Sequence, residues 1–159
     1  MSLLAACAGA PPPPRDGSKT SSPDVDSQVR QPAHEQSSGV QVYPLQNPAV
    51  KSLLAEAKEA EAAGDFNRAA VALERALRIQ PRDPELLQQM AEVQLQKKDY
   101  EQALSFATRS YDSGSRVGEI CSRNWHTISV ARENTGDSSG ATQAKQRAGQ
   151  CMNAKPTSY

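Results

Sequence analysis

The helical period of apolar positions lies almost wholly between residues 49 and 151 of this chain. It is clearest in the segment 64–81, where one helix face is formed by Phe66, Ala69, Leu73 and Ala76. These positions recur at steps of three and four, as the helical period requires. Gly64-Asp65 forms the turn before this helix. Pro81 ends it, because proline lacks an N–H and disfavours helical geometry in the residue before it.

The same pattern returns 34 residues later. Asp65-Phe66 is repeated as Asp99-Tyr100, and Ala69 is repeated as Ala103. A third and weaker copy has its turn at Gly136-Asp137, after a spacing stretched by four residues. Such degeneration suits a terminal repeat, whose outer face meets water.

These residues resemble the tetratricopeptide-repeat (TPR) family, whose period is 34 residues and whose unit is a pair of helices. Small residues stand where two helices cross, an aromatic residue follows the turn, and Pro81 stands at the exit of the first pair. The resemblance implies an all-α fold, a short TPR superhelix of about three helix–turn–helix pairs. The pairs are expected at 49–83, 84–117 and 118–151.

We predict six helices, at 49–63, 66–79, 84–97, 100–113, 119–134 and 138–151. The expected core consists of Leu53, Ala57, Phe66, Ala69, Leu73, Ala76, Leu77, Leu87, Met90, Ala91, Tyr100, Ala103, Leu104, Ala107, Trp125, Ile128, Ala141 and Ala148. Trp125 occupies a packing position of the family, which favours a role in the core over a role as a ligand anchor.

The first third of the chain has a different composition. Residues 8–48 are rich in Pro, Ser, Gln and Gly and contain few large apolar residues. Such a segment cannot bury enough surface to offset its ordering entropy, so we expect a disordered tether. The predicted organisation is an export-signal remnant (1–7), the tether (8–48), the TPR domain (49–151) and a disordered tail (152–159).

Leu4-Ala5-Ala6-Cys7 resembles the lipobox of bacterial lipoproteins, in which the signal peptidase cuts before a lipid-bearing cysteine. The resemblance implies that Cys7 is lipidated and that Ala8, in place of Asp, directs the protein to the outer membrane. No basic segment precedes the motif and its apolar run is short, so either the true start lies upstream or the match is chance. The alternative to a lipoprotein is a cytosolic protein with an isolated cysteine.

The other two cysteines, Cys121 and Cys151, lie equally far from the turn at Gly136. In an antiparallel helix pair such positions stand at the same level, so the two sulfur atoms could form a disulfide that closes the last hairpin. Packed helix axes lie about 8–10 Å apart, so Cys151 must lie near the end of its helix to reach bonding geometry. A disulfide fits an oxidising compartment. The alternative is a pair of unpaired buried thiols.

Charge and motifs exclude several function classes. The formal net charge is zero and no basic stripe is present, so nucleic acid is not an expected partner. No acidic pair is arranged for acid–base work, and no nucleophile accompanies His34 or His126. No phosphate-binding glycine loop or metal-ligand spacing occurs. We therefore predict a non-enzymatic protein without a cofactor, metal or small-molecule substrate.

Stacked TPR hairpins leave a concave face lined by the first helix of each pair. Family geometry places on this face Leu54, Lys58, Gln88, Glu92, Leu95, Gln96, Arg123, His126 and Val130. Polar side chains with isolated apolar ones suit a short extended peptide or a helix as the ligand. The alternative for Lys58, Glu92 and Arg123 is that they form an ordinary solvated surface.

The whole layout, a lipobox, a Pro-rich tether and a short TPR domain that contains Arg123-Asn124-Trp125, resembles the LpoP-type outer-membrane lipoproteins. The resemblance implies a lipid-anchored, periplasm-facing protein that binds and activates a class A penicillin-binding protein, the bifunctional peptidoglycan synthase. One alternative is a generic TPR scaffold for pilus, secretion or outer-membrane assembly machinery. Another is a small peptidoglycan-processing enzyme or enzyme subunit, which the missing catalytic residues disfavour.

Overall fold

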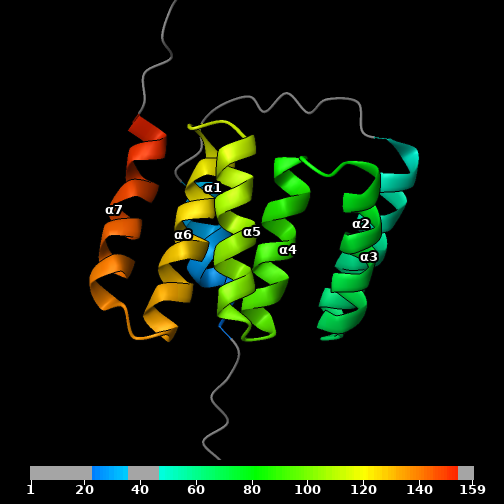
Figure 1. Ribbon diagram of the computed structural model, residues 1–159, viewed down its shortest axis with the longest axis horizontal. Helices are drawn as coiled ribbons and strands as arrows, with labels where there is room; N and C mark the ends of the chain where they lie inside the picture. Colours follow the sequence, from blue (N-terminus) through cyan, green and yellow to red (C-terminus); the bar gives the residue numbers. More distant parts are fainter. Residues whose placement is uncertain (1–22, 36–46, 154–159) are drawn as a thin grey trace, which may run out of the picture.

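The computed structural model describes residues 23–35 and 47–153. Their helices are η1 (Asp26–Arg30), α1 (Gln31–Glu35), α2 (Pro48–Ala62), α3 (Phe66–Ile79), α4 (Pro84–Gln96), α5 (Tyr100–Ser113), α6 (Glu119–Asn134) and α7 (Ser138–Asn153). Figure 1 shows α2 to α7 as a row of three helix pairs. The predicted all-α TPR fold is confirmed, and each of the six predicted helices agrees with the structure to within two residues. Cys7 and most of the predicted tether and tail lie outside the described residues.

The three hairpins begin their second helices in the same way. In each, an aspartate side chain caps the new helix by accepting the N–H of the residue three positions on, over 3.0 Å for Asp65, 3.2 Å for Asp99 and 2.8 Å for Asp137. Such a cap satisfies an N–H group that has no partner inside the helix. The Asp that follows each turn therefore fixes where the second helix starts.

The residue before each of these aspartates has a positive φ, 73° at Gly64, 62° at Lys98 and 86° at Gly136. The chain leaves the first helix through a left-handed residue whose N–H returns to the last helical turn, as Gly64 does to Glu61 over 2.9 Å. Glycine adopts this conformation at no steric cost. Lys98 has a Cβ and adopts the same conformation with strain.

Small residues allow the helices to approach one another. Ala69, Ala103 and Ala141 are all buried, at 0%, 0% and 3% exposure. Apolar side chains fill the spaces between the hairpins in three clusters, one of which joins α2, α3 and α4 through Leu53, Leu73 and Met90. The alanines that define the repeat in the sequence therefore define the packing as well.

The last hairpin is closed by the predicted disulfide between Cys121 and Cys151, whose Cα atoms lie 5.8 Å apart. The N–H of Gly118 donates to the carbonyl of Cys151 over 3.0 Å at the same end of the hairpin. The start of α6 and the end of α7 are thus held by one covalent bond and one backbone hydrogen bond.

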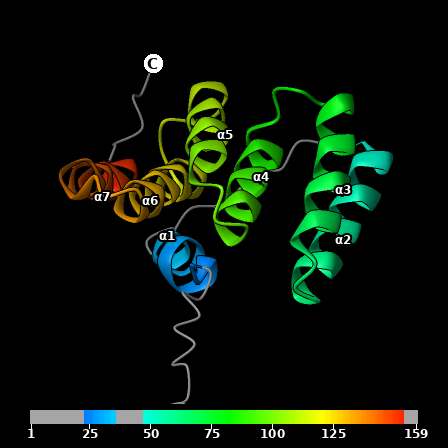
Figure 2. The same cartoon turned by 60° about the horizontal axis from the view of Figure 1, so that its bottom comes forward.

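The prediction of a disordered segment at 8–48 is wrong for residues 26–35. They form a helix, η1 continued by α1, which we call the N-terminal helix. Figure 2 shows it beside α6 and α4, two helices that lie far from it in the sequence. Val25, which caps its start, and its own Val29 and Ala33 are at most 1% exposed. These few apolar residues suffice because the domain supplies the rest of the buried surface, which the composition of the segment alone does not reveal.

The predicted tail is also shortened. Helix α7 continues to Asn153, beyond the predicted end at residue 151. The disulfide explains this extension, because it holds Cys151 against α6 and so keeps the last helical turn from fraying.

Candidate partner-binding groove

The first helices of the three hairpins, α2, α4 and α6, line one face of the stack, which we call the groove. The N-terminal helix lies on this face, next to α4 and α6 (Figure 2). Together with α3, α5 and α6, it leaves every residue of α4 from Leu86 to Leu95 buried, including the polar Gln88 and Glu92. A helix that is buried all round must satisfy its polar groups inside the protein.

Glu92 is the centre of the polar contacts in the groove, and its side chain is fully buried. Its Oε2 accepts a hydrogen bond from Nε of Arg30 over 2.6 Å. Its Oε1 accepts from Nε of Arg123 over 2.9 Å and from Nε2 of Gln88 over 2.9 Å. Gln88 also donates to Oγ1 of Thr127 over 2.8 Å. One carboxylate therefore joins the N-terminal helix, α4 and α6.

The ionisation of Glu92 follows from its neighbours. Burial by itself would raise the pKa of this carboxyl, because a low dielectric disfavours the charged form. The guanidinium groups of Arg123 and Arg30 act in the opposite direction and prevail, so the pKa of Glu92 lies below its usual value. Glu92 is thus an anion that two cations hold in the interior.

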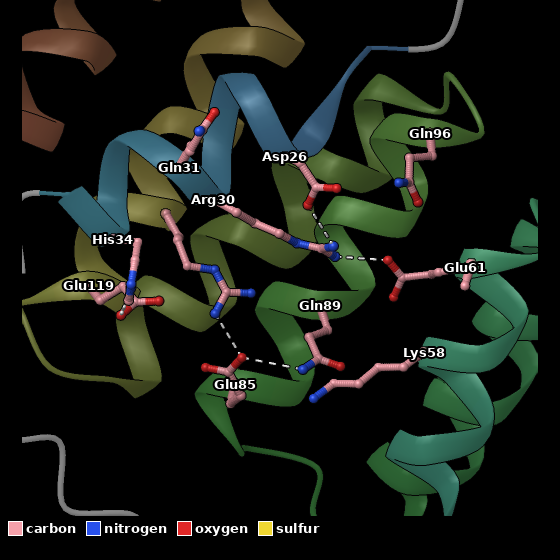
Figure 3. A pocket seen from close by; sticks show the side chains of 12 residues that line it. Asp26, Arg30, Gln31, His34, Lys58, Glu61, Glu85, Gln89, Gln96 and Glu119 are labelled. Carbon is pink, nitrogen blue, oxygen red and sulfur yellow. Dashed lines mark hydrogen bonds and ion pairs between the residues drawn. The ribbon is translucent and has the colours of Figure 1, made fainter.

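Arg30 forms the other half of this contact. Besides Glu92, its guanidinium binds Oε2 of Glu61 on α2 over 2.8 Å and Oδ1 of Asp26 on its own helix over 3.1 Å. Figure 3 shows Arg30 reaching from the N-terminal helix towards Glu61. The planar guanidinium can donate in several directions at once, which a lysine cannot do in the same geometry. Arg30 therefore connects the first hairpin to the second.

A cavity of about 640 Å³ remains in the groove beside the N-terminal helix. Its wall includes Lys58 and Glu61 of α2, Glu85 of α4 and Arg123 of α6. Arg123 also binds Glu85 over 2.8 Å, and Figure 3 shows Glu85 hydrogen-bonded to Gln89 in the same wall. The cavity is lined by charges of both signs, so it suits a ligand that offers paired polar groups.

The apolar part of the groove lies against the other side of the N-terminal helix. Val25 and Val29 pack with Leu95 of α4, Ala103 of α5 and Val130 of α6 in one cluster. Burying aliphatic side chains in this way stabilises the docked helix by roughly 25 cal/mol for each Å² of apolar surface removed from water. The groove thus combines an apolar strip with a carboxylate site for a cation.

Most of the residues predicted for the concave face do surround this groove. Three of them line the mixed-charge cavity, namely Lys58, Gln96 and Arg123. Glu92, Leu95 and Val130 contact the N-terminal helix. Gln88 holds Glu92, and His126 lines a hollow beside the N-terminal helix. Leu54 lies elsewhere, in the apolar cluster between the first two hairpins. The alternative of a solvated surface is wrong for Glu92 and Arg123, because the N-terminal helix covers them.

His126 lines a second hollow of about 610 Å³ with Gln28 and Pro32 of the N-terminal helix and Lys145 of α7. Burial, together with the nearby Lys145 ammonium, lowers the pKa of His126. Within the described part of the chain its Nε2 has no hydrogen-bond partner. The imidazole is therefore neutral at neutral pH and does not add a cation to the groove.

Trp125 lies in the packing between α5, α6 and α7. Its ring meets that of Tyr111 edge-on, with centroids 5.0 Å apart. The guanidinium of Arg147 lies 4.7 Å from the centroid of Trp125, and that of Arg116 lies 4.1 Å from the centroid of Tyr111. Trp125 is half-buried and fully engaged, in agreement with its predicted role in packing.

Sequence reasoning missed Arg30, Glu61 and Glu85, all of which take part in the groove. Glu61 and Glu85 lie on first helices, on the same face as predicted residues. Glu61 is one turn after Lys58, and Glu85 is one turn before Gln88, so extending the predicted face by one turn would have included both. The composition of residues 8–48 places Arg30 in the predicted tether. One sequence feature does indicate a helix here: Val25, Val29 and Ala33 recur every four residues, directly after Asp24.

Residues 23–35 and 47–153 contain no group of three His, Cys, Asp or Glu residues that could hold a metal ion. In the same two segments, no helix is both long enough and apolar enough to cross a bilayer. The chemistry that the groove does offer is recognition through an apolar strip, a buried carboxylate and a mixed-charge cavity.

Comparisons with known proteins agree with this geometry. The tetratricopeptide-repeat family matches residues 60–109. The solved structure of the globular C-terminal domain of LpoP from P. aeruginosa is similar to this chain, with 38% sequence identity and a TM-score of 0.63. The match covers 98% of the LpoP domain and 65% of this chain.

The chain belongs to the LpoP-like tetratricopeptide-repeat proteins. Among proteins of curated function, none matches it. A fold of this family is typically non-enzymatic and implies a protein partner.

Proposed function

We propose that this protein is an outer-membrane lipoprotein that faces the periplasm and binds and activates a class A penicillin-binding protein. The observation that carries the proposal is the 38% identity across 98% of the globular domain of LpoP. A similarity that extends over a whole domain supports a shared partner class more strongly than a general TPR motif does, since TPR surfaces vary while their packing residues persist.

The groove gives this proposal a physical mechanism. Activation requires that the protein bind the active state of the synthase more tightly than the resting state, since only differential binding shifts an equilibrium. The proposed contact surface is the groove with the mixed-charge cavity, where Lys58 is exposed and Arg123 is held by Glu85. Cys7 is the proposed attachment point of the lipid, and the segment after it is the proposed tether.

The test uses the full chain with Cys7→Ser, which removes the lipid site but keeps the domain. The class A synthase of the same organism polymerises lipid II in the presence and absence of this protein, and binding is measured in parallel. We expect binding and a faster polymerisation rate. A synthase that neither binds nor changes its rate would reject the proposal and leave a scaffold for another envelope machine as the better account.

A matched pair of variants locates the surface. Lys58→Glu reverses a charge in the wall of the cavity, whereas Lys51→Glu reverses an exposed charge on the same helix outside it. We expect Lys58→Glu to weaken binding of the synthase by about tenfold, equivalent to about 1.4 kcal/mol, and Lys51→Glu to leave it unchanged. Equal effects of the two variants would place the contact surface elsewhere.

The lipid anchor is tested separately. Cells expressing the native chain should carry it in the outer-membrane fraction, labelled by a fatty-acid analogue. Cys7→Ser should remove both the label and the membrane association. Retention of the label in that variant would show that Cys7 is not the lipidated residue.

A further inference from the structure

We propose that the groove is a receptor for an amphipathic helix that carries an arginine, and that the N-terminal helix occupies this receptor until a helix of the same pattern from a partner protein replaces it. The inference deepens the proposed function by naming the ligand class of its site, and it rests on that function only for the identity of the partner. The contacts of the N-terminal helix define what the receptor accepts.

The apolar part of the ligand is a stripe with a spacing of four residues. Val25, Val29 and Ala33 are at most 1% exposed, while their neighbours Gln28 and Gln31 are exposed. In a regular α-helix a step of four overshoots a turn of 3.6 residues, so such a stripe drifts around the helix. The π-helical winding of Asp26–Arg30, where the N–H of Gln31 donates to the carbonyl of Asp26, widens the turn and offsets this drift.

The polar part of the ligand is the guanidinium of Arg30. It is received by Glu92 at 2.6 Å and by Glu61 at 2.8 Å, two carboxylates from different hairpins. Arg123 and Gln88 belong to the groove itself and hold Glu92 in place at 2.9 Å each. The receptor is therefore preorganised, because the groups that position its central carboxylate remain when the ligand leaves.

The N-terminal helix is suited to exchange. Its described part is ten residues long (Asp26–Glu35), and isolated helices shorter than about 12–15 residues are marginal in water. Pro32 lies inside it and removes one N–H from its hydrogen-bond ladder. Docking into the groove is thus what holds this segment helical, and a competitor that takes the groove releases it.

These contacts define the pattern of the partner helix. It carries aliphatic residues at positions i and i+4, arginine at i+5 and a small residue at i+8, in the places of Val25, Val29, Arg30 and Ala33. The N-terminal helix of the same chain competes with a partner helix for the groove. The apparent affinity for the partner is therefore proportional to the fraction of molecules whose groove is free. Release of the N-terminal helix should therefore raise the affinity for the partner.

The experiment measures the binding of a fluorescent peptide with the sequence of residues 23–35 to the full chain. The variant Val29→Asp places a charge in the apolar strip and should release the N-terminal helix, leaving the groove empty. We expect the peptide to bind this variant at least about tenfold more tightly than the wild type. The control Gln28→Asp introduces the same charge at the adjacent exposed position and should behave like the wild type.

The arginine is tested in the peptide, where folding of the domain is not at risk. Replacing Arg30→Ala in the peptide should lower its affinity for the Val29→Asp chain by about tenfold or more, because a bound peptide without the guanidinium covers the carboxylates of Glu61 and Glu92 and supplies no cation for them. Replacing Arg30→Lys should restore only part of the affinity, because lysine lacks the fork of donors that Arg30 uses. Equal binding of all three peptides would overturn the assignment of an arginine receptor.

If Val29→Asp fails to fold, Arg30→Glu serves as the second release variant, because it sets like charges against Glu61 and Glu92. A folded release variant that does not bind the peptide would overturn the proposal. A wild-type dimer with exchanged N-terminal helices would also overturn it, in favour of a contact between two copies. Peptide exchange without activation of the synthase would reject the proposed partner alone, whereas activation without peptide exchange would reject this inference alone.

Discussion

Arg30 and Glu92 are 62 residues apart in the chain, and their side chains meet over 2.6 Å inside the groove. Arg30 comes from a segment whose composition indicates disorder, and Glu92 comes from the middle of the second hairpin. The contact buries a full carboxylate charge, which is favourable only with close and well-directed cations. It therefore ties a short helix of low intrinsic stability to a specific place on the repeat domain.

The first prediction concerns the stability that Glu92 provides. Glu92→Gln should lower the free energy of unfolding by about 3 kcal/mol, because removing one partner of a buried ion pair leaves the other charge uncompensated. Chemical denaturation followed by circular dichroism measures it. Glu59→Gln is the matched control, since Glu59 pairs with Arg68 at 3.7 Å on the surface. Its loss should cost about 0–1 kcal/mol, and equal losses in the two variants would contradict the assigned role of Glu92.

The second prediction concerns pH. The folded pKa of Glu92 lies below its ordinary value of 4.5, so the unfolded chain binds this proton more readily than the folded one. Ionised Glu92 therefore makes its full contribution to the unfolding free energy at any pH above its ordinary pKa. That contribution is lost as the pH falls through the lower pKa of the folded state. The difference in unfolding free energy between the wild type and Glu92→Gln should shrink as the pH is lowered below 4.5. A difference that grows in acid would contradict this account.

The third prediction concerns the turn of the second hairpin. Lys98→Gly should raise the free energy of unfolding by about 0.5–1 kcal/mol, because glycine removes the strain of a left-handed residue. The matched control is Lys97→Gly, one position earlier, where φ is −77°. Glycine should lower stability at position 97, because the backbone there is not strained and glycine increases the conformational entropy of the unfolded chain. Thermal unfolding of the two variants in parallel measures both signs.

The fourth prediction concerns the disulfide. Reducing the bond between Cys121 and Cys151, which are separated by 30 residues, should lower the unfolding free energy by roughly 3–4 kcal/mol in the chain-entropy model. The double variant Cys121→Ala with Cys151→Ala should show a similar loss and be insensitive to reductant. In a Cys7→Ser chain, which has no third cysteine, two free thiols in the oxidised, denatured protein would contradict the presence of the bond.

The repeat domain could be predicted from the sequence because its signals are local. The Gly-Asp and Lys-Asp turns, the small residues at the crossings and Pro81 each act within a few positions, so they fix helix bounds to within two residues. The pairing of Cys121 with Cys151 followed from the same geometry.

The N-terminal helix could not be predicted because its stability comes from the groove. Val25, Val29 and Arg30 carry little helical signal among prolines, serines and glutamines, and their partners are Leu95, Val130 and Glu92 far along the chain. The sequence places the groove residues on first helices, but their burial depends on a segment whose composition predicts a disordered tether. Leu54 was misplaced because the groove and the core share one helix, α2.

The central claim is that the N-terminal helix occupies the groove and can be exchanged for a similar helix. Hydrogen exchange at the backbone amides of residues 26–35 tests it most directly, in the wild-type chain titrated with free peptide of residues 23–35 carrying a distinguishing isotope label. The account predicts slow exchange in the chain alone and faster exchange of these amides as peptide is added, while the amides of α3 and α5 stay protected. Exchange that stays slow at every peptide concentration, or that is fast without peptide, would contradict it.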